Sequence, residues 1–402
     1  MRIGVVVDNE FENDHRLQKE IRLLITEGHT VSVLCFDFGK AYKTYDSINV
    51  KRVKIPKKIK DLLVLLSTRF GLYEWFWEKH ISNFIQEFQV DALHVHDLYM
   101  AKAGKRGINR SKFTIPLTLD LHENYPAAIN SYQWATKGWR KLVVQPKKWY
   151  KKEEAYLNYA DNLVVLSKSF KENLITRFPS LETTPFFVHP NMPDFESFQS
   201  FEKNDLVVDF ESETPTLFYF GVVAQRRGII DILPWIKALL EGGKEFHTLI
   251  IGPVDKADKS EFYHLINQPI LSKNITYIPW ADVKFLPAYL KQITIGLAPF
   301  RVNEQHNSGV ANKLFQYMYG EIPILATKCK AQKELIESAN CGLLYECKQE
   351  FETQLSKLLD DKTLRQTLGA NGKKKLLKLY ELESDKQFLN IYNGHKIDSQ
   401  NQ

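Results

Sequence analysis

Two arginines and a lysine in the second half of the chain are the residues whose spacing best suits an anion. Arg226 and Arg227 lie between Gly221, where an apolar segment ends, and a segment with helical periodicity; Lys313 lies in the first turn of another expected helix. A guanidinium presents a planar set of donors that matches phosphate oxygens. A cation in the first helical turn opposes the helix dipole unless an anion binds there. We therefore predict a phosphate or diphosphate site; the alternatives are a solvated arginine pair and a lysine that extends to solvent.

The residues near Lys313 in the sequence strengthen this prediction. Ser308, Gly309 and Val310 lead into its helix, whose free backbone amides suit an anion that the glycine allows to approach closely. Trp280 follows an expected strand and could stack on a nucleotide base, although core packing is the commoner role of a single tryptophan. These residues extend the candidate anion site into a candidate nucleotide site.

Histidines and acids follow two expected strands in the first half of the chain. His96 and Asp97 end one strand, and His122 and Glu123 follow the next. In open α/β sheets, ligands bind beyond the C-terminal ends of the strands. His122 could bond a transferred group or sense deprotonation of an acceptor, with Glu123 orienting it. The alternatives are a loop histidine that caps a turn and a purely structural role for His96 and Asp97.

The elements that must position these residues alternate between strands and helices. Short apolar runs without polar alternation are typical of strands buried in a parallel sheet. Such runs lie at residues 3–7, 31–36, 92–97, 115–121, 163–166, 186–188, 217–220, 249–252, 275–278, 293–299, 322–326 and 342–345. Helical patterns separate many of them, so we predict an α/β fold with doubly wound, mostly parallel sheets.

A chain of 402 residues is too long for one typical core, so we expect two domains. We assign residues 1–195 to a first domain, the weakly periodic residues 196–214 to a linker, residues 215–380 to a second domain, and residues 381–402 to a C-terminal helix. The glycine fingerprint of dinucleotide-binding folds and the Walker lysine motif are both absent from the sequence. Their absence disfavours a nicotinamide dehydrogenase and a P-loop enzyme.

The amino-acid composition narrows the class of protein further. Apolar residues make up 44% and charged residues 25% of the chain, which is ordinary for a globular protein. The four cysteines form no CxxC pair, so we expect neither a disulfide framework nor a bound metal. No window approaches 18 continuous apolar residues, and the apolar N-terminal run is too short for a signal peptide, so we expect a cytoplasmic protein.

Basic residues interleave with aromatic residues in two segments, 137–141 and 147–152, and a second basic strip runs from Arg52 to Lys60. Such faces suit an anionic bilayer or a polyprenyl-phosphate acceptor. Without a recognition motif for nucleic acid, we expect no such partner. A solvated helix face is the alternative.

Several short motifs, spread over most of the chain, resemble glycosyltransferase family 4, the group 1 transferases. In the second half they are Gly221–Gly228, Ala298–Phe300, Asn312–Met318 and Gly320–Pro323. In the first half they are Asp14–Arg16, Lys19–Glu20, Gly28–Val31, His94–Asp97, Asp120–Glu123, Ala160–Asn162 and Leu166–Ser167. The resemblance implies the GT-B fold, in which two Rossmann-like domains face each other across a cleft and a C-terminal helix returns to the first domain.

The resemblance also implies a function. We expect a nucleotide-diphosphate-sugar donor with its diphosphate contacted by Arg226 or Arg227 and Lys313, a sugar or lipid-linked acceptor, retention at the anomeric carbon, and neither cofactor nor metal. The sites near Asp14, His96, Asp97 and His122 would hold the acceptor.

The chain departs from the family at one pair of positions. The family often carries two glutamates eight residues apart, where this chain has Ser308 and Gln316. Gln316 could still bond a ribose hydroxyl, but Ser308 cannot replace a carboxylate. Two alternatives therefore stay open: a nucleotide-sugar epimerase of the same fold, and a non-catalytic module that binds a glycan or a partner.

Overall fold

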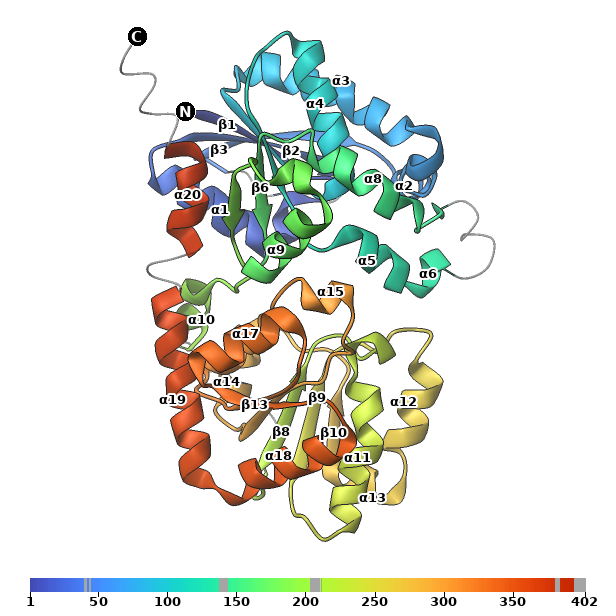
Figure 1. Ribbon diagram of the computed structural model, residues 1–402, viewed down its shortest axis with the longest axis vertical. Coiled ribbons are helices and arrows are strands. Elements are labelled where there is room, and N and C mark those ends of the chain that lie inside the picture. Colours follow the sequence, from blue (N-terminus) through green and yellow to red (C-terminus); the bar gives the residue numbers. More distant parts are fainter. Residues whose placement is uncertain are drawn as a thin grey trace. The chain divides into compact units, whose positions relative to one another are not determined.

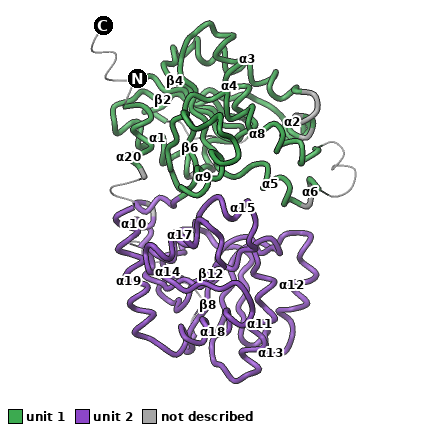
Figure 2. Tube along the Cα trace, viewed as in Figure 1, with its two compact units in different colours: residues 1–191, 382–402 green, residues 192–381 purple. Residues whose placement is uncertain are grey.

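The computed structural model describes residues 1–39, 42, 45–136, 144–202, 210, 212–379 and 384–393. The chain forms two compact units, shown in different colours in Figure 2. Unit 1 comprises residues 1–191 and 382–402, and unit 2 comprises residues 192–381. Each unit contains one parallel sheet with helices packed on it (Figure 1), which confirms the predicted α/β architecture.

The sheet of unit 1 has seven parallel strands in the order β3-β2-β1-β4-β5-β6-β7. The strands are β1 (Arg2–Val6), β2 (Thr30–Asp37), β3 (Ile48–Lys54), β4 (Ala92–His96), β5 (Leu117–Asp120), β6 (Asn162–Val165) and β7 (Phe186–Val188). The chain runs outward from β1 to β3 and then returns to β4 on the other side of β1. The C-terminal ends of β1 and β4 therefore form a topological switch point, where ligands bind in sheets of this kind.

Helices cover both faces of this sheet. They are η1 (Phe11–Asn13), α1 (His15–Thr26), α2 (Lys57–Phe70), α3 (Leu72–Phe88), η2 (Leu98–Met100), α4 (Ala101–Ser111), α5 (Tyr125–Ser131), α6 (Gln133–Thr136), α8 (Lys148–Leu157), α9 (Lys168–Arg177), η3 (Pro179–Leu181) and α20 (Ser384–Asn393). The C-terminal helix α20 packs against α1 and β7, and its Asp385 forms an ion pair with Lys19, with Oδ1 and Nζ 2.9 Å apart. Phe388 and Tyr392 are buried in the core on this face.

Strand β3 is an element that the sequence pattern did not predict. From sequence, Arg52 and Lys54 are expected in a basic strip, and the structure places them in this edge strand. Arg52 forms an ion pair with Glu12, and Lys51 forms one with Glu87. Edge strands often carry such charges, which block pairing with other chains and also disguise the apolar pattern of a strand.

The sheet of unit 2 has six parallel strands in the order β10-β9-β8-β11-β12-β13. They are β8 (Thr216–Phe220), β9 (His247–Ile251), β10 (Ile275–Ile278), β11 (Ile295–Ala298), β12 (Ile324–Thr327) and β13 (Gly342–Tyr345). The switch point here lies between β8 and β11, because the chain leaves β8 toward β10 and returns on the opposite side.

The helices of unit 2 again pack on both faces. They are α10 (Phe195–Glu202), η4 (Gln225–Arg227), α11 (Ile229–Glu241), α12 (Lys259–Ile266), α13 (Pro269–Asn274), η5 (Val283–Phe285), α14 (Leu286–Leu290), α15 (Glu304–Asn307), α16 (Asn312–Tyr319), α17 (Lys330–Ala339), α18 (Lys348–Asp360) and α19 (Lys362–Lys378). Among the helices within the described ranges, none is long and apolar enough to cross a membrane.

Residues 195–202 differ from the linker expected in their place. They form helix α10, in which Phe195 and Phe198 are buried in a core of unit 2. The ring of Phe195 stacks on Tyr319 with centroids 5.3 Å apart, and Phe198 meets Tyr319 edge-on at 5.4 Å. Aromatic residues three apart thus anchor a helix that is too short to show clear periodicity. Residues 203–209 and 211 of the expected linker lie outside the described residues.

Candidate functional site

The basic residues of unit 2 gather at the switch point of its sheet. Gly221 follows β8 directly, Arg226 and Arg227 form η4, and Lys313 lies in the first turn of α16. A Cβ atom added to Gly221 would lie 3.7 Å from Lys313 Nζ. Lys313 is also close enough to Arg227 for the positive charge of Arg227 to lower the pKa of Lys313. Residues nearly a hundred positions apart are therefore brought together as the phosphate prediction requires.

Lys313 is buried in surroundings that contain aromatic rings. Its Nζ lies 3.4 Å from the ring centroid of Tyr219 and 5.1 Å from that of Phe300. This nitrogen is buried and makes no hydrogen bond within the described part of the chain. Burial, together with the charge of Arg227, holds the pKa of Lys313 well below its ordinary value. A buried ammonium group without an anionic partner is costly, so the site is suited to receive a negative charge.

A neutral histidine completes the basic site. The Nδ1 atom of His306 lies 2.7 Å from the carbonyl oxygen of Arg301, to which it can donate a hydrogen bond. Burial lowers the pKa of His306 to about 4, and the charges of Arg227, Arg226 and Lys313 act in the same direction. His306 could not be selected from sequence, because a single histidine in a polar loop shows no pattern.

The other predicted donor residues have different surroundings. Ser308 and Gln316 are buried, and the Ser308 hydroxyl donates a hydrogen bond of 2.7 Å to the carbonyl of Glu304. Gly309 and Val310 are partly buried between α15 and α16. Trp280 is 71% exposed, so it does not pack in a core and its ring is accessible for stacking.

Gly228 holds η4 against the loop after β11. Its φ angle is +75°, and an added Cβ atom would lie 1.5 Å from the carbonyl oxygen of Pro299. We predict that Gly228→Ala lowers the free energy of unfolding by about 3–5 kcal/mol, since both the φ angle and the backbone of the loop must change. Gly243 is a matched control, because its φ angle is +86° but nothing lies within 4 Å of its added Cβ.

Denaturant unfolding of both variants measures this difference. Gly243→Ala should cost only about 1–2 kcal/mol, the strain of a left-handed conformation. Equal losses for Gly228→Ala and Gly243→Ala would show that the contact with Pro299 does not matter.

Polar residues also gather at the switch point of unit 1. Asp97 follows β4 with a φ angle of +72°, an uncommon conformation for a residue other than glycine. Tyr99 donates to Asp97 at 3.2 Å, and Tyr73 donates to Asp8, which follows β1, at 2.6 Å. Burial raises the pKa of Asp97 to about 7, and the charges of Asp8 and Glu123 add to this. Backbone strain of this kind is typical of functional sites.

His122 lies beside a buried network that the sequence did not reveal. Arg16 Nη2 donates to both carboxylate oxygens of Asp120 at 2.9 Å, and Arg16 Nε lies 2.9 Å from Glu20. His122 Nε2 is 3.7 Å from Asp120 Oδ2 and 2.7 Å from His96 Nδ1. These contacts fix the ring of His122, whose side chain is 20% exposed, at the rim of the network.

The electrostatics of this network follow from its burial and ion pairs. Burial opposes ionisation of Asp120, but Arg16 and His122 outweigh it and hold the pKa of Asp120 well below its usual range. Burial and the charge of Asp120 raise the pKa of Glu20 to about 8. For His122, the Asp120 carboxylate overcomes the effect of burial and raises the pKa to about 9. His122 is therefore a cationic hydrogen-bond donor at neutral pH.

Two residues expected to hold the acceptor have other surroundings. Asp14 accepts a hydrogen bond of 3.0 Å from the backbone amide of Leu17 and so caps α1. His96 is fully buried behind His122, so it can act on a ligand only through that neighbour. Glu123 accepts a hydrogen bond from Tyr132 at 3.1 Å. His122, Glu123 and Asp97 remain the residues of unit 1 placed for direct contact.

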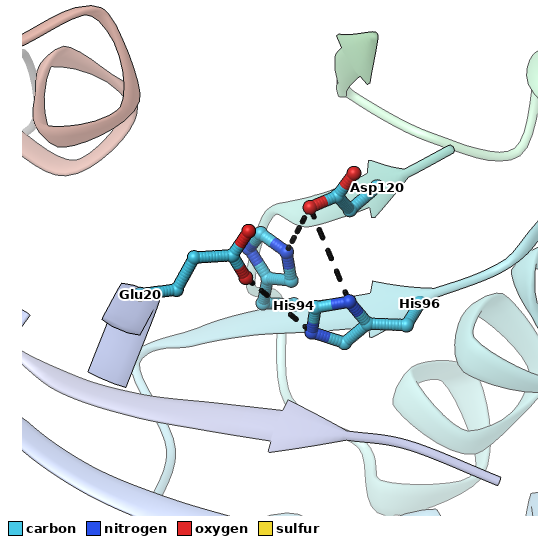
Figure 3. Close-up of side chains that lie close together, drawn as sticks. All are labelled: Glu20, His94, His96 and Asp120. Atoms are coloured by element: carbon cyan, nitrogen blue, oxygen red, sulfur yellow. Dashed lines mark ion pairs between the residues drawn. The ribbon is translucent and has the colours of Figure 1, made fainter. Parts of the chain in front are cut away.

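Four side chains of the network could together hold a cation. Glu20, His94, His96 and Asp120 each offer one ligand atom, and these atoms lie within 4.8 Å of one another (Figure 3). From sequence we expect no metal, because the cysteines form no CxxC pair. These four residues come from three segments that are distant in the sequence. The signals were the spacing of two residues between the histidines on a strand and the spacing of four between Arg16 and Glu20 on a helix.

The basic aromatic segment 147–152 is only partly a surface. Trp149 is buried and packs edge-on against Tyr125, with Lys152 Nζ 5.3 Å from its ring centroid. An open membrane-binding face that includes this tryptophan is therefore wrong, because the ring belongs to the core of unit 1. Residues 137–141, the other half of the expected face, lie outside the described residues.

Comparisons with known proteins agree with this architecture. The family model described as Glycosyltransferase Family 4 matches residues 18–196, and the model described as Glycosyl transferases group 1 matches residues 200–375. The capsular polysaccharide biosynthesis glycosyltransferase CapM of Staphylococcus aureus is 23% identical over 252 residues, a match that spans 60% of this chain and 62% of CapM.

Solved structures match over almost the whole chain. Sucrose-phosphate synthase from Thermosynechococcus elongatus has a TM-score of 0.73 and 13% identity, with 100% of both chains covered. An E. coli structure described as trehalose-6-phosphate bound with UDP-2-fluoro glucose has a TM-score of 0.68 and 11% identity, with 98% of both chains covered. These likenesses establish the fold.

Proposed function

Since the chain belongs to the group 1 glycosyltransferases of family 4 and has their GT-B fold, we propose that it transfers a glycosyl unit from a nucleotide-diphosphate-sugar to an acceptor hydroxyl. One observation carries the proposal: buried Lys313, without a hydrogen-bond partner at Nζ in the described chain, lies close to Arg227. The UDP-2-fluoro glucose in one structural relative supports this class of donor.

The proposed reaction uses these cations to stabilise the leaving group. The acceptor oxygen forms a bond to the anomeric carbon while the bond from that carbon to the diphosphate oxygen breaks. Lys313, Arg226 and Arg227 stabilise the negative charge that develops on the diphosphate. The departing phosphate oxygen takes the acceptor proton, so that attack and departure occur on one face and configuration is retained. With three cationic side chains in this role, we propose neither a metal nor a cofactor for the transfer.

We assign His122 to hydrogen-bond a substrate hydroxyl. Its raised pKa keeps it protonated near neutral pH, and its contact with His96 holds the ring at the rim of the buried network. Glu123 and Asp97 are the remaining candidates for hydroxyl contacts, and Trp280 is the candidate for stacking on the base. Gln316, one turn after Lys313, is the candidate for a ribose hydroxyl.

The acceptor is proposed to be a polysaccharide or lipid-linked sugar. The likeness to CapM supports a role in polysaccharide biosynthesis. Exposed apolar side chains on α2 and α3 support peripheral contact with an anionic bilayer, because lysines accompany them. The apolar residues are Ile59, Leu62, Leu72 and Trp75, and the exposed lysines are Lys57, Lys58 and Lys79.

Vesicle flotation tests this membrane contact. We predict that Leu62→Ser combined with Trp75→Ser lowers binding to vesicles of anionic phospholipid at least about fivefold, through the loss of buried apolar area. Leu377→Ser is the matched control, since Leu377 is an exposed leucine on a helix of unit 2. Unchanged flotation of the double variant would exclude α2 and α3 as the contact.

Incubation with nucleotide-sugars tests the function itself. A thermal-shift screen of uridine, guanosine, adenosine and thymidine diphosphates selects the base, and the matching sugar donor is then incubated with and without acceptors. Transfer that requires an acceptor supports the proposal. A new sugar isomer formed from donor alone would indicate an epimerase, and binding without turnover over an acceptor panel would indicate a non-catalytic module.

A further inference from the structure

Four buried side chains of unit 1 converge on one small space. His94 and His96 are two residues apart on β4, so both point to the face of the sheet covered by α1, and Asp120 pairs with His96 from the adjacent strand β5. Glu20 reaches this space from α1 (Figure 3). We propose that Glu20, His94, His96 and Asp120 bind a divalent transition metal, with zinc as the best match.

Three of the ligand atoms, His94 Nε2, His96 Nε2 and Glu20 Oε2, are buried and make no hydrogen bond with the described residues. Asp120 Oδ2 accepts a hydrogen bond of 2.9 Å from Arg16. His94 Nε2 lies 3.8 Å from Asp120 Oδ2, and His96 Nε2 lies 3.9 Å from Glu20 Oε2. These separations are too long for hydrogen bonds. Two ligands of one tetrahedral ion with bonds of about 2.0 Å lie roughly 3.3 Å apart. The four ligand atoms, which lie within 4.8 Å of one another, must therefore move closer together to bind the ion.

The surrounding groups orient the histidines as a metal site requires. His94 Nδ1 lies 2.5 Å from the hydroxyl of Tyr392, and His96 Nδ1 lies 2.7 Å from His122 Nε2. With a metal bound, His94 Nδ1 would donate to Tyr392, and His96 Nδ1 would donate to His122 Nε2, which gives up its proton. The Nε2 atoms of His94 and His96 would then be the ligands. Metal-binding histidines usually donate their second ring nitrogen in this way, which fixes the tautomer and the ring.

The types of donor atom select the metal. Two imidazole nitrogens and two carboxylate oxygens suit zinc, whereas magnesium and calcium prefer oxygen ligands alone. The bound ion would connect α1 to β4 and β5 beside His122, as a structural site and not as part of the transfer reaction.

Metal analysis of the whole chain is the first test. After incubation with zinc and dialysis, we expect about one equivalent per chain by mass spectrometry, and a melting temperature several degrees above that of the chelator-treated protein, with no such rise for magnesium. Glu20→Gln and His94→Gln should each lower the retained zinc at least tenfold. His264→Gln, at an exposed histidine of unit 2, should retain it. Circular dichroism without metal checks that each variant is folded.

A second measurement needs no variant. In zinc-treated crystals of the unmodified protein, we expect an anomalous difference peak among the four side chains. Less than a tenth of an equivalent of zinc, retention that is the same in the cluster variants, or an ordered water at that position would overturn the proposal. Zinc binding to unit 1 is expected without any nucleotide, so failure to bind diphosphates at Lys313 would leave this result unchanged.

Discussion

Lys313→Met is expected to stabilise the ligand-free protein while it weakens binding of nucleoside diphosphates by roughly 100-fold, the loss of a charge-assisted bond in a buried site. Lys313 is buried between Tyr219 and Phe300, and burial with the charge of Arg227 depresses its pKa. Methionine fills a similar volume without a charge to desolvate. Stability and binding should therefore change in opposite directions, which a purely structural lysine would not show.

The gain in stability should depend on pH. Because the pKa of Lys313 is lowered in the folded state, the unfolded chain binds more protons between that lowered pKa and about 10.4. The stability of the unmodified protein therefore rises with pH through this window. The advantage of Lys313→Met should be largest at the low end of the window and should disappear above about pH 10.4, at about 1.4 kcal/mol per unit of pKa depression.

Denaturant unfolding at several pH values and calorimetric titration with nucleoside diphosphates measure the two effects. Lys373→Met is a useful control, because Lys373 Nζ also lies over a tyrosine ring, that of Tyr319 at 3.9 Å, but donates to a carbonyl oxygen. It should leave binding unchanged. A loss of stability with unchanged affinity in Lys313→Met would contradict the assigned role.

Arg16→Met should lower the free energy of unfolding by about 3–5 kcal/mol, the cost of leaving buried carboxylates without their cation. Asp120 is fully buried, and both its oxygens accept hydrogen bonds from Arg16, which also forms an ion pair with Glu20. The side chain also donates to the carbonyl oxygen of His189 at 3.0 Å. The substitution therefore removes one partner each from Asp120, Glu20 and the carbonyl of His189.

Arg2→Met is the matched control for this variant. Arg2 also bonds a carboxylate in a bidentate manner, that of Asp91, but the pair is exposed, so its loss should cost far less stability than the loss of the Arg16 network. Chemical unfolding of both variants with a chelator present keeps metal binding out of the comparison. Equal losses of unfolding free energy in Arg16→Met and Arg2→Met would show that burial of the Arg16 network contributes nothing to stability.

Much of the fold could be predicted from sequence because parallel strands are buried on both faces. Segments such as Leu217–Phe220 and Leu249–Ile251 are continuous apolar runs, and a single sequence displays them directly. Strand β3 was missed because its charges belong to an edge strand, and α10 was missed because two buried phenylalanines are too few to establish a helical period.

In the candidate sites, too, some residues could be selected from sequence and others could not. Lys313 could be selected because a cation in the first turn of a helix is a local anomaly, visible without a structure. The rings of Tyr219 and Phe300 around Lys313 could not be predicted, since their contact with the lysine depends on how β8, β11 and α16 pack together. The same holds for Arg16, Glu20, His94 and Asp120, which are ordinary in their own segments and meet only when α1 packs on the sheet.

The central proposition is that Lys313 and Arg227 bind the diphosphate of a sugar donor. A crystal structure with the nucleoside diphosphate selected by thermal shift tests it most directly. We predict phosphate oxygens within hydrogen-bond distance of Lys313 Nζ and of the Arg227 guanidinium, with the base beyond the end of the unit 2 sheet. A nucleotide bound elsewhere, with the Lys313 ammonium still enclosed by its aromatic rings and unchanged, would contradict it.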